Sequence, residues 1–532
     1  MINFFKNFNN QNKRLIEYIF FFLAWSLIWS TIGARLTDLY SFEFSVAKSI
    51  NWFRALINIS FPAIIVLLLL FKLLRNKIDL KSPFLILLAY FLIQSSIFYT
   101  DEFQNIITNI FNKDIINQMK WNDQYGLIFS GIGIFLMATT SIIFILIFEK
   151  EKKILIQRAL ITTLIIYLLI NFFYSLKLFY EYIKTDEIPL FYYTSELNYG
   201  SIILDNVAPR STGISRSLVI LSILSAVILE ACCHPRYKKY LYLFIILINI
   251  LIFSLSSRFG TYSLLLFIFF TIIFFKRSFK DTFFNIFLII GIPFFLAYYT
   301  AEIKVDRYYT KNFTKLGIDK FDEKEIEHQL KVQKKDGTLE YQGLRSLWKR
   351  KIENSDIATK TNSQQQQEFR DKNEDHKDPE TSEINLSGRD IIWRESLNYF
   401  FTSNNKFFGT GSQADRRILY SNKKIYEDFG NHSSNGFIYA LLSTGFVGLI
   451  LLLIFNFVLL NKIYGSIFIK EKYKKPKKYF IDFYFIILFC FLNLRMIFEN
   501  SYSLFGVDFL IYLTSAFFII NNENKLQLIT KE

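Results

Sequence analysis

Apolar residues fall in blocks of about 18–22 residues along most of the chain, with short polar connections between them. A block of that length crosses the hydrocarbon core of a bilayer as one helix, whereas a globular core is built from shorter apolar runs. The pattern therefore predicts an all-α polytopic membrane protein. We predict twelve spanning helices, centred near these residues: Phe22, Val66, Ala89, Leu136, Ile165, Ile223, Ile246, Ile268, Ile289, Leu449, Ile487 and Ile511.

The blocks divide the chain into three parts. Residues 1–300 hold nine predicted helices, residues 301–431 form one large hydrophilic loop, and residues 432–532 hold the last three helices. Within the loop, residues 353–383 are a polar, low-complexity tract that cannot bury enough apolar surface to fold alone, so we predict a flexible insertion. Order is predicted to resume near Ile384 with an amphipathic helix, whose apolar positions are Ile391, Ile392, Leu397 and Phe400.

Positive charge gathers in every second connection between the blocks. Basic loops face the cytoplasm, so both termini are predicted to be cytoplasmic and the large loop to lie outside. The same rule accounts for the net charge of +15 without a nucleic-acid partner. The basic connections are Lys13-Arg14, Lys72 to Lys77, Lys150 to Lys153, Arg236 to Lys239, Lys276-Arg277 and Lys472 to Lys478.

Four arginines run against this charge rule, because they lie at the outer ends of predicted spans or in the large loop. Arg210 and Arg216 flank the start of the sixth span, Arg258 lies in the turn between the seventh and eighth, and Arg389 precedes the amphipathic helix. One guanidinium group can bind two phosphate oxygens at once and stays charged at any relevant pH. The four arginines therefore predict an anionic ligand. For any single arginine, snorkelling or a salt bridge to a neighbouring acid is the alternative.

The run His432-Ser433-Ser434-Asn435-Gly436 leads directly into the tenth span. A histidine titrates near neutral pH and suits general-base work, although it could equally be a capping or hydrogen-bonded interfacial residue. Ser434 and Asn435 are typical helix N-caps, and a helix start exposes N–H groups that suit a phosphate or an oxyanion. Gly445 and Gly448 predict close packing of that helix.

Other kinds of site are poorly supported. Cys232, Cys233 and Cys490 lie in or beside apolar blocks, which favours neither a disulfide framework nor a zinc site. The chain has no Gly-rich phosphate loop and no nucleophile elbow, so neither a metal nor another cofactor is predicted. Near the outer end of the eleventh span, Arg495 and Glu499 could pair with each other or join the site.

Together these segments resemble the O-antigen polymerase and O-antigen ligase family of bacterial envelopes. This chain differs from the family at Ser434, where family members often have a histidine directly before the asparagine. The resembling motifs are Arg210-Ser211-Thr212-Gly213, Ser256-Ser257-Arg258, Ser387-Gly388-Arg389 with Trp393, Phe407-Phe408-Gly409-Thr410-Gly411-Ser412, His432 to Phe437, and Gly445-Phe446-Val447-Gly448.

The resemblance implies a metal-independent glycosyltransferase of the GT-C type in the bacterial inner (plasma) membrane, with the large loop in the periplasm. The donor would be a glycan on polyprenyl pyrophosphate, the acceptor a glycan or lipid A core, and a chain-length regulator is a candidate partner. His432 would orient or deprotonate the acceptor hydroxyl, with Arg389 also in the catalytic group. The pyrophosphate ligands would be Arg210, Arg216, Arg258 and Arg389, and the supporting residues Trp393, Ser434 and Asn435.

Three functions stay open at this point. A polymerase that joins repeat units is the leading hypothesis, and a ligase that moves finished glycan to lipid A core is the second. A flippase for the same lipid-linked glycan is the alternative from another class. The single large external loop and the lack of repeated halves speak against a transporter.

Overall fold

The computed structural model describes thirteen segments of the chain, which together hold most of the predicted spans. They are residues 63–67, 81–109, 124–184, 211–231, 234–255, 258–275, 278–300, 331–333, 339–341, 389–421, 433–469, 472–504 and 506–521. The predicted polar insertion at 353–383 and the first predicted span, near Phe22, lie outside the described residues. The division of the chain into three parts therefore stays a prediction.

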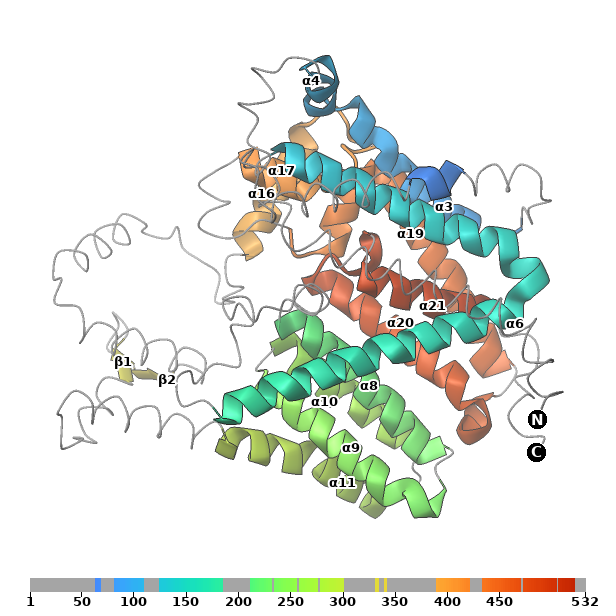
Figure 1. Ribbon diagram of the computed structural model, residues 1–532, viewed down its shortest axis with the longest axis vertical. Coiled ribbons are helices and arrows are strands. Elements are labelled where there is room, and N and C mark those ends of the chain that lie inside the picture. The colour runs from blue at the N-terminus through green and yellow to red at the C-terminus, as the bar shows by residue number, and fades with distance from the viewer. Residues whose placement is uncertain are drawn as a thin grey trace, which may run out of the picture.

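The described residues are mainly helical (Figure 1). Two short strands in the large loop, β1 (Lys331–Gln333) and β2 (Leu339–Tyr341), pair antiparallel with Val332 opposite Glu340. The helices are α3 (Phe84–Ile93), α4 (Asp101–Asn109), α6 (Gln124–Lys184), α8 (Ser211–Ala231), α9 (Pro235–Ser254), α10 (Arg258–Phe275), α11 (Phe279–Ile286), α16 (Arg389–Thr402), α17 (Ala414–Ser421), α19 (Gly436–Tyr464), α20 (Phe480–Phe498) and α21 (Val507–Asn521). Shorter helical turns are η2 (Gln94–Tyr99), η3 (Phe287–Gly291), η4 (Gly465–Ile469), η5 (Lys472–Lys474), η6 (Pro476–Tyr479) and η7 (Ser501–Ser503).

The described helices confirm a multi-pass membrane protein. One bent pair, Phe84–Tyr99 with Asp101–Thr108, turns by 55° and counts as a seventh candidate span. Six helices are long and apolar enough to cross a membrane: Lys153–Tyr180, Gly213–Ala231, Pro235–Ser254, Phe279–Thr300, Gly436–Ile467 and Pro476–Phe498. Three shorter apolar helices are Gly131–Ile147, Phe259–Phe275 and Val507–Asn521. The described residues thus give six or seven full-length spans, and the predicted number of twelve stays a prediction.

The helices around α8 expose apolar side chains in a way that suits lipid. Among the 18 most apolar consecutive residues of Gly213–Ala231, 83% are buried. The corresponding share is 33% for Pro235–Ser254 and 22% for Phe279–Thr300. Phe279, Phe283 and other large apolar side chains remain exposed on the poorly buried helices. A water-soluble protein rarely exposes so much apolar surface, so these faces are expected to contact the bilayer.

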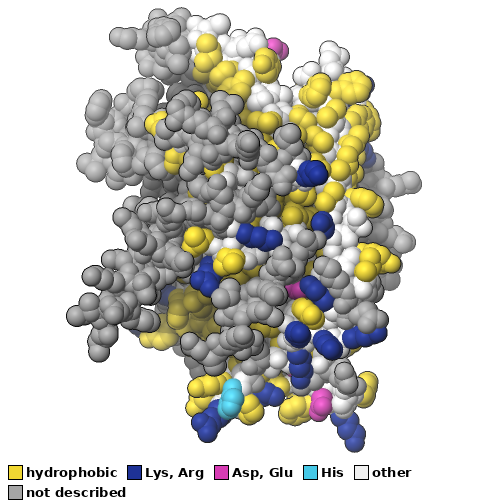
Figure 2. All heavy atoms as spheres, turned by 90° about the vertical axis from the view of Figure 1, so that its right-hand side faces the viewer, with side chains coloured by type: hydrophobic (Ala, Val, Ile, Leu, Met, Phe, Trp, Pro, Cys, Tyr) yellow, Lys and Arg dark blue, Asp and Glu magenta, His cyan; other side chains and the backbone are white. Residues whose placement is uncertain are grey.

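The long helix α6 contains two apolar stretches. Figure 1 shows α6 changing direction partway along, so that its second half returns past α8. The apolar stretches Gly131–Ile147 and Lys153–Tyr180 are separated by a charged run, Glu149-Lys150-Glu151-Lys152. Figure 2 views the end of the bundle that lies on the right of Figure 1, and it shows many Lys and Arg side chains but few Asp and Glu. This charge pattern favours the predicted cytoplasmic orientation of that end.

Helix α19 is interrupted at Gly445, whose φ of 64° and ψ of −167° are not helical. A broken helix in an apolar environment leaves backbone groups without partners, which is unfavourable. The loop between α16 and α17 supplies partners. The N–H of Phe446 donates to the Lys406 carbonyl at 2.9 Å, and the N–H of Gly411 donates to the Ser443 carbonyl at 2.9 Å. The motif from Phe407 to Ser412 and the motif from Gly445 to Gly448, which are far apart in the sequence, therefore contact each other through backbone hydrogen bonds.

Glycine is required at this junction for steric reasons. Gly409 has a φ of 66°, and a Cβ on it would lie 2.5 Å from the backbone nitrogen of Thr444. A Cβ on Gly445 would lie 2.3 Å from the carbonyl carbon of Phe407. The predicted close packing at Gly445 is confirmed, but the neighbour is the backbone of a loop and not a second spanning helix.

The Gly445→Ala variant is expected to destabilise the protein. The positive φ alone costs about 1–3 kcal/mol for a residue with a Cβ, and the clash with the loop backbone adds to it. The midpoint of thermal unfolding in detergent should fall well below that of the wild type. Gly465→Ala is the matched control, because Gly465 has helical dihedral angles and open space where the Cβ would be. Equal midpoints for the two variants would contradict this account of the junction.

Candidate functional site

The segment directly after His432 is a rigid turn that starts α19. Asn435 caps the helix, since its side-chain oxygen accepts hydrogen bonds from the N–H groups of Phe437 at 3.0 Å and Ile438 at 3.1 Å. Ser434 is buried and has a φ of 50°, a conformation that residues with a Cβ seldom adopt. The predicted capping role of Asn435 is confirmed. Ser434 instead forms the sharp bend before the cap.

A buried carboxylate, Asp415 of α17, holds this turn. Its Oδ2 accepts a hydrogen bond from the backbone N–H of Ser433 at 2.9 Å and one from the Ser433 hydroxyl at 3.0 Å. The amide nitrogen of Asn500, between α20 and η7, donates to the same oxygen at 3.0 Å. Asp415 and Ser433 are both fully buried. The helix in the large loop is thus joined to two elements at one end of the membrane bundle.

Two further hydrogen bonds fix the turn from other sides. The indole Nε1–H of Trp393 in α16 donates to the Ser433 carbonyl at 2.8 Å. The side-chain amide of Asn435 donates to the carbonyl of Ile497, near the end of α20, at 3.0 Å. Helix α16 buries Ile392 and Phe400 at its predicted apolar positions, so its position beside the turn follows from its amphipathic pattern. Trp393, predicted to support the site, lies against it.

The second polar cluster lies at the starts of α8 and α21 and the end of α20. Arg216 and Asp508 form an ion pair at 2.8 Å, and Arg495 Nε donates to Asp508 Oδ2 at 2.7 Å. The side chains are between 6% and 11% exposed, so all three are essentially buried. Tyr167 of α6 accepts a hydrogen bond from Arg216 at 3.2 Å. Four helices therefore converge on one carboxylate.

This cluster carries more positive than negative charge. Two guanidinium groups share the single carboxylate of Asp508, which leaves one positive charge in excess. Arg495 also lies over the ring of Phe259 in α10, 5.3 Å from its centre, a cation–π arrangement. The buried Arg216 Nε has no hydrogen-bond partner among the residues that the structure describes. The surplus positive charge of the cluster would favour an anionic ligand.

An apolar pocket adjoins this charged cluster. It lies between α6 and α21, and Tyr167, the partner of Arg216, is part of its wall. Val507, next to Asp508 in the chain, is part of the opposite wall. The remaining lining residues are Leu160, Thr163, Leu164, Leu510, Ile511 and Thr514. The free volume of this pocket is about 30 Å³, so it could take only a short apolar group beside the cluster.

The other predicted site residues are described to different extents. Arg389 is the first residue of α16 and is partly buried. Arg258 begins α10, next to Phe259 and hence next to the ring that Arg495 contacts, but its side chain is not among the described atoms. Arg210 and His432 lie outside the described residues, directly before α8 and directly before Ser433. Among the described residues, α8 packs against α10 and α16 packs against α19. Of the four predicted arginines, only Arg216 has a described side-chain ion pair.

Arg417 is a further buried arginine that sequence reasoning missed. It lies in α17, two residues after Asp415, and its guanidinium is 3.6 Å from the carboxylate of Glu102 in α4. It also donates to the carbonyl of Thr410. Burial lowers the pKa of Arg417 below its usual value, and the nearby Glu102 carboxylate opposes that shift. Its contacts are accounted for by folding, since they join α17 to α4 and to the loop that fills the break in α19.

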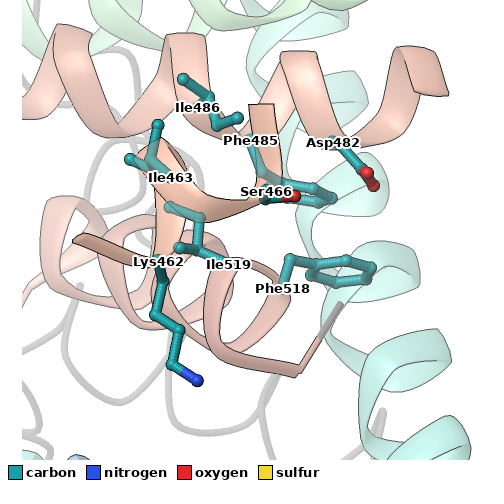
Figure 3. A pocket seen from close by; sticks show the side chains of 8 residues that line it. All are labelled: Lys462, Ile463, Ser466, Asp482, Phe485, Ile486, Phe518 and Ile519. Atoms are coloured by element: carbon teal, nitrogen blue, oxygen red, sulfur yellow. The ribbon is translucent and has the colours of Figure 1, made fainter. Parts of the chain in front are cut away.

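A small pocket at the other end of the bundle is distinct from these clusters. Figure 3 shows it between the end of α19, the start of α20 and the end of α21, with Phe485 and Phe518 in its wall and Lys462 pointing away. The candidate site lies at the start of α19, the end of α20 and the start of α21. A helix rises 1.5 Å per residue, so the 29 residues of α19 alone separate the two ends by roughly 40 Å. The pocket is therefore not part of the site.

Comparison with known proteins covers one part of these elements, and Arg216, Arg495 and Asp508 lie outside it. Residues 241–453 match a family model described as O-antigen ligase. This part of the chain is therefore similar to the O-antigen ligase family. This confirms the resemblance seen in the sequence motifs. The matched O-antigen ligase region begins within α9, includes α16, α17 and the Ser433–Asn435 turn, and ends within α19. No curated protein and no solved structure matches the chain.

The residues that sequence reasoning missed differ in how visible they were. Asp508 begins an apolar block, and a carboxylate in such a position needs a positive partner, so it offered a usable signal. Arg495 was noted, but its side chain pairs with Asp508, while Glu499 contacts it through a backbone hydrogen bond of 2.9 Å. Asp415 gave no signal, because it lies in the unremarkable run Gln413-Ala414-Asp415-Arg416-Arg417.

Asp508→Ala is expected to destabilise the protein more than Arg216→Ala. The first variant leaves two buried guanidinium groups without a carboxylate, at a cost of about 3–5 kcal/mol, whereas the second leaves Asp508 paired with Arg495. Thermal unfolding in detergent would measure the order of the midpoints. A midpoint for Asp508→Ala equal to or above that of Arg216→Ala would contradict the shared ion pair.

Proposed function

We propose that the protein is a polymerase that transfers polyprenyl-pyrophosphate-linked oligosaccharide units to a growing glycan at the periplasmic face of the bacterial inner membrane. The match to the O-antigen ligase family supports glycosyl transfer in general. The observation that carries the finer proposal is the excess positive charge at Arg216, Arg495 and Asp508, next to an apolar pocket. A lipid pyrophosphate has the charge and the chain that these two features suit.

The arginines would neutralise the leaving group. In the reaction the bond between the anomeric carbon and the pyrophosphate oxygen breaks, and the oxygen leaves with the electron pair. Arg216 contributes a buried guanidinium with unused donor capacity, and the other ligands proposed are Arg210, Arg258 and Arg389. Fixed charges in a site that excludes water stabilise such a leaving group far more than exposed charges do. The first apolar atoms of the carrier chain would lie against the pocket between α6 and α21, and the rest of the chain would lie in the bilayer.

His432 would act on the acceptor. It would take the proton of the acceptor hydroxyl as that oxygen forms the new bond to the anomeric carbon. The proton would then be on the imidazole, and the electron pair of the broken bond would be on the pyrophosphate. His432 directly precedes Ser433, and Trp393, Ser434 and Asn435 support the turn that follows it. We therefore keep these three as supporting residues.

The predicted architecture belongs to the same proposal. Twelve spans, a GT-C arrangement, cytoplasmic termini and a periplasmic large loop would place the charged cluster at the outer leaflet. The few acidic side chains among the Lys and Arg on the opposite end of the bundle support this orientation (Figure 2). The partners proposed are the lipid-linked donor, a glycan acceptor, the bilayer and a chain-length regulator.

The ligase is the second candidate, because the matched family model carries that description. It would use the same donor and move finished glycan to lipid A core. Deletion of the gene separates the two: loss of long chains with a single unit still attached indicates a polymerase, and carrier-linked polymer left unattached indicates a ligase. A flippase would give no product longer than its input with purified protein and lipid-linked donor.

Arg216→Ala and Arg389→Ala are expected to abolish polymer formation while the protein still inserts into the membrane. Each removes a positive charge from the leaving group, for which one lost electrostatic contact costs on the order of 10²–10³-fold in rate. The assay measures product length from purified protein and lipid-linked donor. Arg158→Ala is the control, because Arg158 is an exposed arginine of α6 about 13 Å along the helix from Tyr167, the residue that Arg216 contacts. Normal polymer length in both site variants would contradict the pyrophosphate role.

Polymer formation is expected to continue in EDTA. In the proposed reaction, arginines supply the positive charge that a divalent cation supplies in many phosphate-transfer enzymes. The same purified assay, with and without chelator and with Mg²⁺ restored, measures this. Loss of product in EDTA and its return with Mg²⁺ would show that the arginines do not act alone.

A further inference from the structure

The turn from Ser433 to Asn435 is held on every side by groups from different elements. Asp415 binds the Ser433 N–H and hydroxyl, and Trp393 binds the Ser433 carbonyl. Asn435 is bound by the carbonyl of Ile497 and caps its own helix. Ser434 adopts a positive φ, which persists only where the surroundings enforce it. Such a turn cannot shift without breaking several buried hydrogen bonds.

The Ser433 nitrogen that Asp415 binds belongs to the peptide bond with His432. A peptide unit is planar, so holding the N–H and the carbonyl of Ser433 fixes the orientation of the peptide bonds on either side of Ser433. Consecutive Cα atoms are about 3.8 Å apart. Asp415 therefore acts within one residue of His432 although it lies on a separate helix.

The bonding pattern at Asp415 is specific to a carboxylate. Oδ2 receives hydrogen bonds from Ser433 and Asn500, and Oδ1 receives one from the N–H of Arg416 at 2.9 Å. All of these partners donate, and an ionised carboxylate is the side chain that only accepts. An asparagine at position 415 would place its own N–H groups against one set of these donors and would lose those hydrogen bonds. The negative charge and both oxygens are thus used in holding the turn.

We propose that Asp415 is a positioning residue that fixes the backbone at His432 for glycosyl transfer. This inference rests on the proposed function, in which His432 acts on the acceptor hydroxyl. Asp415 acts through the Ser433 peptide and touches no substrate. A misplacement of a reacting group by about 1 Å costs on the order of 10²-fold in rate, so loss of the hydrogen bonds should lower turnover and leave donor binding intact.

The kinetic test compares Asp415→Ala, Asp415→Asn and Trp393→Phe in the purified full-length protein with lipid-linked donor. We expect kcat to fall on the order of 10²-fold for Asp415→Ala and less for the other two, with the donor KM within about twofold of wild type. Trp393→Phe removes the hydrogen bond to the Ser433 carbonyl, in the next peptide bond along the chain, and keeps an aromatic ring, so it serves if Asp415→Ala does not fold. Asp482→Asn is the control, since Asp482 is a buried acid paired with Lys472 at the opposite end.

Hydrogen–deuterium exchange of peptides that cover residues 433–438 tests the turn independently of activity. Exchange should be slow in the wild type and clearly faster in Asp415→Ala, but unchanged in Asp482→Asn. Wild-type kcat in Asp415→Ala, a fall in kcat matched by an equal rise in donor KM, or unchanged exchange would each overturn the proposal. Full activity in His432→Ala would instead remove the proposed role of that histidine, while the exchange result would still decide whether Asp415 holds the turn.

Discussion

The Asp508 carboxylate, shared by Arg216 and Arg495, is the interaction on which the arrangement of the bundle depends. A guanidinium buried at the end of an apolar helix is costly, and one acid brought to two of them reduces that cost while drawing α8, α20 and α21 together. The cluster has a net positive charge, because two guanidinium groups pair with one carboxylate. In the proposed function, folding and binding would use the same residues: the acid would assemble the site, and the surplus charge would attract the anionic ligand.

A second constraint is the need to satisfy backbone groups where α19 is broken at Gly445. The loop after α16 gives its carbonyl and N–H groups to the broken turn, and Asp415 ties α17 to the start of the same helix. The first part of α19, from Gly436 to Gly445, is thus held at both of its ends by residues of the large loop. This explains why motifs on the loop and on the helix belong to one family pattern: neither has its backbone satisfied without the other.

The sequence predicted the parts of this arrangement that follow from local chemistry. Apolar blocks predicted spanning helices, the spacing of Ile392 and Phe400 predicted the buried face of α16, and Asn435 was recognised as a cap. Contacts between distant segments were not predictable in the same way. No local pattern shows that Asp508 would accept from both Arg216 and Arg495, or that Asp415 would bind the Ser433 peptide, because these pairs depend on how whole helices pack. The break at Gly445 was hidden for a related reason: the glycine predicted close packing of the helix and gave no sign of an interruption.

The central claim, that the charged cluster is the pyrophosphate site, is tested most directly by an experimental structure of the protein with polyprenyl pyrophosphate bound. The account predicts phosphate oxygens within hydrogen-bond distance of the Arg216 guanidinium and the isoprenoid chain along the pocket between α6 and α21. Phosphate density at the basic end shown in Figure 2, with Arg216 and Arg495 still engaged only with Asp508, would contradict it.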